Sequence, residues 1–146
     1  MAIHTLASAS HEIIHTLFKR KGLKNLMFDA DVIRDEYRGE FGKFMRKAAT
    51  FFKHAQRDPD AELDFDPRLN ELLLLMSAFG LERMKVPLGI PEAALMNWYH
   101  LHFPEFFSEN VFAERLPPES LEELRQIPKR EFFETFALDM RKRGAV

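Results

Sequence analysis

The sequence predicts an all-α protein: a helical bundle of five to seven helices with no sheet. Apolar residues recur at three- and four-residue steps over most of the chain, and proline and glycine stand where helices would begin or end. No stretch keeps the alternating pattern of a strand for long. With 146 residues, 46% of them hydrophobic and 15 of them phenylalanine, we expect one domain over residues 1–146.

The first expected helix covers residues 2–21. A basic run, Lys19-Arg20-Lys21, suits the negative end of its dipole, and Gly22 follows as a stop signal. On a helical wheel its apolar face centres near Leu6, Ser10 and Leu17. The wheel therefore predicts that this face is buried. The residues that recur at helical spacing are Ile3, Leu6, Ser10, Ile13, Ile14 and Leu17.

Two helices are expected next, a short one over residues 29–38 and a strongly amphipathic one over residues 40–56. An acidic loop over residues 58–66 follows, and Asp66-Pro67 supplies an N-cap and a first-turn proline for a helix that runs to about Arg83. Residues 72–76 of that helix are apolar nearly all round. We therefore expect it to be the central helix of the bundle.

Three more helices are expected in the last third of the chain. Pro91 opens one that ends near Phe103, a second begins near Ser120 after two prolines, and a third covers residues 129–143 after Pro128. The aromatic cluster at residues 98–103 is typical of a core edge, and lining of a pocket is the alternative.

Composition excludes several classes of protein. The chain has no cysteine, which excludes disulfides, thiolate metal sites and a cysteine nucleophile and fits a reducing compartment. No apolar run is long enough to cross a membrane, and no signal peptide is recognisable, so we expect a cytoplasmic protein without a membrane partner.

Charge is unevenly distributed along the chain. Residues 1–57 hold 11 Lys and Arg against 6 Asp and Glu, whereas residues 58–146 hold 10 against 17. The basic half is suited to a polyanion such as RNA. The alternative is that the two halves complement each other across the bundle surface.

One catalytic motif is present, His11-Glu12-Ile13-Ile14-His15, which has the H-E-x-x-H spacing of zinc hydrolases. In that chemistry the two histidines hold zinc and the glutamate activates a bound water. The wheel places His4, His11 and His15 at the margin of the apolar face and Glu12 toward solvent, and no spacing nominates a third ligand. Two histidines at the rim of a helix are the simpler interpretation, and we expect no cofactor.

A further motif, in the acidic loop, resembles a calcium-binding EF-hand loop but lacks two of the residues that such a loop needs. Asp58, Asp60 and Glu62 alternate like EF-hand ligands, but Leu63 stands where the loop needs glycine and Leu69 where it needs glutamate. No phosphate-binding loop, dinucleotide fingerprint or nucleophile elbow occurs.

The segment Ala49-Thr50-Phe51-Phe52-Lys53-His54 ends a basic amphipathic helix and precedes a polar loop and a helix initiated by Asp-Pro. This arrangement resembles the HEPN superfamily of small helical bundles, over roughly residues 1–83. The resemblance implies a metal-independent ribonuclease site of Arg and His, assembled across a dimer. Only Thr50 and His54 match, because Ala49 stands at the position of the arginine. The opening of the chain and residues 51–60 are also similar to uncharacterised bacterial helical proteins.

These observations predict a non-catalytic binding or regulatory module with a protein partner, including a homodimer, and with RNA as a further partner. The candidate binding residues are Lys43, Lys47, Thr50 and His54, on the basic helix. The alternative is a metal-binding protein or metal-dependent hydrolase that uses His11, Glu12 and His15.

Overall fold

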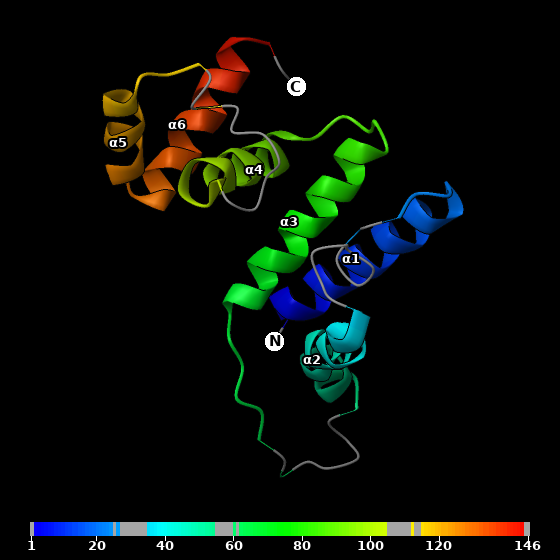
Figure 1. The fold of residues 1–146 in the computed structure, drawn as a ribbon. Coiled ribbons are helices and arrows are strands. Elements are labelled where there is room, and N and C mark those ends of the chain that lie inside the picture. The colour runs from blue at the N-terminus through cyan, green and yellow to red at the C-terminus, as the bar shows by residue number, and fades with distance from the viewer. Residues whose placement is uncertain are drawn as a thin grey trace. The chain divides into compact units, whose positions relative to one another are not determined.

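The computed structural model of the chain describes residues 2–24, 26, 35–54, 60, 62–104, 112 and 115–144, and this part contains six α-helices and no strand (Figure 1). The all-α prediction is confirmed. The chain divides into two compact units, Met1–Val86 and Pro87–Val146. The single domain expected over residues 1–146 stays a prediction.

The first unit is built on α1, Ala2–Arg20, which packs against both α2, Asp35–Lys53, and α3, Arg68–Arg83. In Figure 1, α1 and α3 run side by side in the same direction. Each helix contributes one residue to a core cluster formed by Ala7, Met45 and Leu73. A second buried cluster, formed by Phe18, Leu26 and Met84, lies at the C-terminal end of α1. Burial of these side chains is what holds the three amphipathic helices together.

The ends of α1 and α3 use the same backbone arrangement. The amide of Gly22 donates to the carbonyl of Lys19 and that of Leu23 to Phe18, with Gly22 at a φ of 73°. This is a Schellman motif, in which glycine is favoured because it tolerates positive φ. The stop signal at Gly22 is therefore confirmed.

The second helix differs from the prediction. The structure has one helix over Asp35–Lys53, so the expected break between residues 38 and 40 is wrong; residues 29–34 and 55–56 lie outside the described residues. Gly39 lies inside the helix and lowers its stability by only about 1 kcal/mol. Burial of Met45, Ala48 and Ala49 on one face outweighs that penalty.

The third helix begins where the sequence indicates, and its apolar run is less enclosed than expected. Pro67 already has helical angles, and the Asp66 Oδ1 accepts a hydrogen bond of 2.9 Å from the amide of Arg68. Leu73 and Leu75 are buried, whereas Leu74 is exposed. One side of the apolar run of α3 is therefore left exposed.

The second unit contains α4, Ile90–His102; α5, Pro118–Gln126; and α6, Lys129–Lys142, with α4 packed against the other two. These bounds confirm the three C-terminal helices. Trp98 meets Phe132 edge to face, with ring centroids 5.3 Å apart, and the Arg125 Nε donates to the carbonyl of Leu101 at 3.0 Å. In the described part of the chain, none of the helices has the length and apolar character to span a membrane.

Candidate functional site

The first helix is turned relative to its predicted orientation. Its histidine side faces the core, and its most apolar stripe faces outward, so the predicted burial of the face around Leu6 and Leu17 is wrong. His4 and His11 are each 1% exposed. The exposed fractions of the outward residues are 68% for Ile3, 70% for Leu6, 60% for Ile13 and 42% for Leu17.

The reason is that α1 carries two stripes with the same spacing. One stripe is buried and consists of His4, Ala7, His11 and Phe18, which are three, four and seven residues apart. The exposed stripe has the same spacing, and each of its residues precedes a position of the buried stripe by one. A shift of one residue rotates the helix by about 100°. Amphipathic spacing therefore allows either face to pack inward, and contacts with α3 decide between them.

His4 gains a specific partner on α3. Its Nδ1 lies 2.9 Å from the Asn70 Oδ1, and the Ser8 hydroxyl lies 3.2 Å from its Nε2. Since the Asn70 oxygen accepts, the Nδ1 carries the proton and the Nε2 accepts from Ser8. Phe52 and Phe65 pack edge-on against the ring. Both ring nitrogens are thus satisfied, which is what a buried imidazole requires.

His11 and His15 stack on each other, with ring centroids 5.9 Å apart. Burial, followed by the proximity of His15, lowers the pKa of His11 to about 4. His11 is therefore neutral at pH 7, the protonation state that a metal ligand needs. Its pKa shift, however, follows from burial and the neighbouring His15 and is no evidence of a metal ion.

The remaining requirements of a zinc hydrolase are not brought together. Glu12 is exposed, as predicted, and its carboxylate lies 3.8 Å from the Lys53 ammonium. Within the described residues, no group of three His, Asp or Glu side chains is arranged to hold a metal ion. The hollow beside His11, between α1, α2 and α3, measures about 10 Å³. That is room for about one water molecule. The metal hypothesis stays a prediction and requires a third ligand from another part of the chain.

The outward side of α1 has the form of an open binding surface. We call it the α1 face and define it by Ile3, Leu6, Ser10, Ile13 and Leu17. A shallow depression of about 400 Å³ runs beside it, lined by Ala9, Glu12, Ile13, Thr16, Leu17 and Arg20. Large apolar side chains, a small residue at the centre and few charges are typical of the middle of a protein interface.

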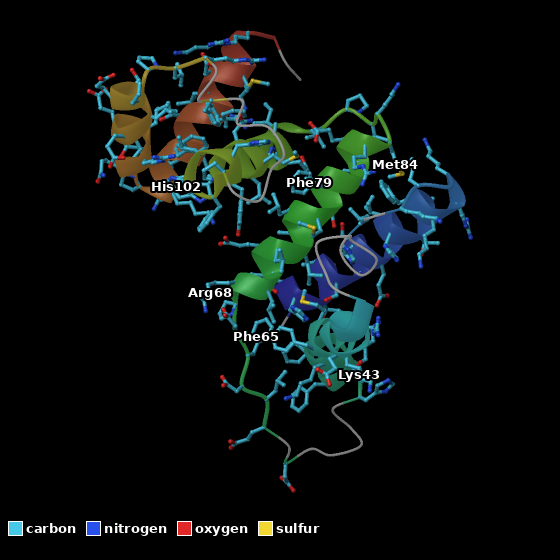
Figure 2. All side chains as sticks on the ribbon, viewed as in Figure 1. Lys43, Phe65, Arg68, Phe79, Met84 and His102 are labelled. Carbon is cyan, nitrogen blue, oxygen red and sulfur yellow. The ribbon has the colours of Figure 1, made fainter. Side chains whose placement is uncertain are left out.

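The four candidate binding residues of α2 lie on one stripe. Lys43, Lys47 and Thr50 are exposed and His54 is half-buried. Their spacing places them on the side of α2 opposite the buried Met45 and Ala48; Lys43 is labelled in Figure 2. Ala49, at the position of the arginine in the HEPN motif, is buried.

In the second unit, aromatic rings surround a lysine. The rings of Trp98 and His102 are tilted by 33° with centroids 3.7 Å apart, and the Lys129 Nζ lies 5.7 Å from the Trp98 ring and 6.0 Å from those of Tyr99 and Phe133. Burial lowers the pKa of His102, and the cations of Arg125 and Lys129 lower it further. The cluster joins α4 to α6, as expected of a core edge.

Comparison with family models, curated proteins and solved structures found no match to this chain. The candidate site residues are therefore assigned from the geometry of this structure. Sequence reasoning missed two features: the bond between His4 and Asn70, for which no local signal exists, and the exposure of the α1 face. The second had no local signal either, because the buried and the exposed stripes of α1 have the same spacing.

Proposed function

We propose that the protein is a non-catalytic binding module whose docking surface is the α1 face. The observation that carries this proposal is the exposure of four large aliphatic side chains in one line on a helix whose opposite side is packed. Contiguous apolar patches of this kind mark interaction sites on soluble proteins. A partner helix fits the narrow stripe, and a homodimer is the simplest form of such an association.

Site-specific photo-crosslinking tests this proposal. A photoreactive residue replaces Ile13 in one variant and Leu138 in another, because both positions are exposed and aliphatic. When cells that express each variant are irradiated, the variant with the photoreactive residue at position 13 is expected to give a discrete crosslinked product, and the variant with it at position 138 is expected to give none. Adding Leu17→Glu is expected to abolish the adduct, because it places a charge in the apolar stripe. Equal labelling at both positions, or none at position 13, would contradict the proposal.

The basic stripe on α2 supports RNA as a second candidate partner. Two exposed lysines, an exposed threonine and the half-buried His54 lie on one side of α2 and just beyond its end, where phosphate groups could be contacted. Retention of single-stranded RNA is expected at low salt, with no cleavage, and to fall steeply as salt rises.

A charge-matched pair of variants tests the RNA site. Lys43→Glu with Lys47→Glu is expected to remove retention, whereas Arg141→Glu with Lys142→Glu changes the net charge equally and is expected to preserve it. Equal loss in both variants would show that the stripe is not the site.

A further inference from the structure

The C-terminal ends of α1 and α3 lie together, and exposed basic side chains gather around them. Phe18 near the end of α1 and Met84 just beyond α3 belong to one buried cluster. The Arg83 Nη1 donates to the carbonyl of Lys24 at 3.1 Å, which ties the two ends to each other. We call this surface the basic end and define it by six exposed residues, Lys19, Arg20, Lys21, Lys24, Arg83 and Lys85.

We infer that the basic end binds the phosphate backbone of RNA without regard to base sequence. This inference rests on RNA as a candidate partner and adds a second surface, on different helices from the basic stripe of α2. Residues 17–24 and 80–86 hold six basic residues and one acidic residue, Glu82, although the first unit as a whole is nearly neutral. Positive charge concentrated at one place on a neutral unit attracts a polyanion to that place.

The dipoles of the two helices account for only part of this charge. Lys19, Arg20 and Arg83 lie in the last turns of α1 and α3, where a cation is favoured. Each helix end carries about half of an elementary negative charge, so the two ends together offset about one positive charge. Lys21 and Lys85 lie beyond the helices. The basic end therefore keeps an excess of positive charge.

Carboxylates of the protein do not neutralise this excess. Elsewhere in the described chain, the Arg68 guanidinium lies 2.7 Å from the Asp66 carboxylate, and the Arg130 guanidinium lies 2.8 Å from that of Glu134. Among the ion pairs of the described residues, none includes Lys19, Arg20, Lys21, Lys24 or Lys85. A phosphate group that binds here does not have to displace a described carboxylate.

The shape of the basic end suits a backbone phosphate and not a base. A shallow hollow of about 360 Å³ is lined by Lys19, Gly22, Leu23 and Lys24. Because both lysines line it, a phosphate group in the hollow is attracted by both. The one aromatic residue in the two segments, Phe18, is 0% exposed, so it offers no ring for a base to stack on. Contacts to the backbone alone carry no sequence information.

The exposed apolar surface at the basic end favours RNA over an anionic membrane. Leu17 and Val86 are 42% and 40% exposed, so neither side chain projects fully from the surface. Binding of a peripheral protein to a membrane depends on apolar side chains that insert between the lipids as well as on basic residues. The basic end supplies the charge and little of the apolar surface.

Fluorescence anisotropy with a labelled RNA oligonucleotide of mixed sequence tests the inference on the full chain. Lys21→Glu with Lys24→Glu is expected to raise the dissociation constant about tenfold or more at low salt, and to reduce the salt dependence by about one phosphate contact per lysine. Lys21→Gln with Lys24→Gln, which adds no negative charge at a helix end, is expected to act in the same direction. Oligonucleotides of uridine alone and of adenosine alone are expected to bind the natural chain equally.

Arg141→Glu with Lys142→Glu is the matched control, because both residues are exposed on α6 and the change in net charge is the same. This pair is expected to leave the dissociation constant unchanged. Equal weakening by both pairs would show that only net charge matters, and undiminished binding by the Lys21 and Lys24 variants would show that the basic end is not used. Either result overturns the inference.

The remaining outcomes separate this inference from the proposals above. Weakening by Lys43→Glu with Lys47→Glu alone keeps RNA as a partner and assigns it to α2, which overturns the basic end. No binding of RNA by the natural chain removes RNA from both surfaces, whereas the docking role of the α1 face is tested separately by the photo-crosslink at position 13. Binding to vesicles that contain phosphatidylserine, lost in the Lys21 and Lys24 variants and without any binding of RNA, would assign the basic end to a membrane and overturn the inference.

Discussion

Burial of His11 links the stability of the fold to pH. The pKa of His11 is lowered to about 4 by burial, whereas an unfolded chain has a histidine pKa of about 6.5. Between these values the unfolded state binds a proton that the folded state does not. Stability contributed by neutral His11 is therefore complete above about pH 6.5 and is lost as the pH falls toward 4.

This shift predicts an acid-dependent loss of stability. The free energy of unfolding of the natural chain is expected to fall by up to about 3 kcal/mol between pH 7 and pH 4 because of His11. Urea denaturation at a series of pH values measures it, with His11→Leu as the comparison because leucine does not titrate. Parallel pH profiles for the two proteins would show that His11 is not the group responsible.

The bond between His4 and Asn70 makes a second prediction. Asn70→Ala leaves a buried imidazole N–H without its acceptor, which costs about 1–3 kcal/mol. Asn97→Ala is the control, since Asn97 is also half-buried but donates to the carbonyl of Ala93 in its own helix. Thermal denaturation is expected to show the larger decrease for Asn70→Ala. An equal decrease in both variants would mean that the His4 contact adds nothing specific.

At the scale of the helices, the close packing of α1 against α3 depends on Gly80. A Cβ at this position would lie 2.5 Å from the Ile14 Cγ2 and 3.0 Å from the Leu26 Cδ2. The two helices can therefore lie this close only where α3 has no side chain. Close packing at this point in turn holds the buried stripe of α1 against α3.

Gly80→Ala is accordingly expected to destabilise the protein by about 1–3 kcal/mol through overpacking, although alanine is the better helix former. Gly39→Ala is the matched control, because a Cβ there meets no atom of the described residues within 4 Å. That variant is expected to be more stable by about 0.5–1 kcal/mol. Chemical denaturation gives both values, and stabilisation by Gly80→Ala would contradict the close approach.

At the scale of the whole molecule, the buried side chains are unevenly distributed among the helices. In the first unit Phe18, Leu26 and Leu75 are almost completely buried; in the second unit the almost completely buried residues Ala94 and Leu101 lie on α4, and α6 has no fully buried residue. A unit of about 60 residues has little interior to protect its backbone hydrogen bonds. Stability is therefore expected to vary along the chain.

Hydrogen exchange measured by mass spectrometry checks this expectation. Peptides from α1 and α3 are expected to exchange most slowly, and peptides from α6 faster, because local opening costs less where fewer side chains are buried. The comparison is internal to one sample. Slower exchange in α6 than in α3 would show that the second unit is the more stable one.

The basic half of the sequence does not coincide with a structural unit. The basic half ends at residue 57, but the first unit extends to Val86 and includes the acidic residues of the loop. That unit holds 14 Lys and Arg and 13 Asp and Glu, so it is nearly neutral. Attraction of a polyanion would consequently depend on local clusters of basic residues and not on net charge.

The sequence by itself determined the helices and most of their ends. Pro91, Pro128 and the Gly22 stop act within a few residues, so local chemistry is sufficient to place them. The end of α3 at Arg83 was predicted as well, although Lys85 there adopts a φ of 59° in the arrangement that Gly22 uses. The exposed position of Glu12 was also predicted, because it lies far from both stripes of α1.

Only the tertiary structure decided which side of α1 is buried. Two stripes of equal spacing, one residue apart, leave the choice open. It is settled by Asn70, 66 residues along the chain from His4, and by the close approach of α3 at Gly80. Burying the histidine stripe satisfies His4 and leaves Ile3, Leu6, Ile13 and Leu17 on the outside. The surface proposed to bind a partner exists because long-range contacts oriented the helix against its simplest apolar pattern.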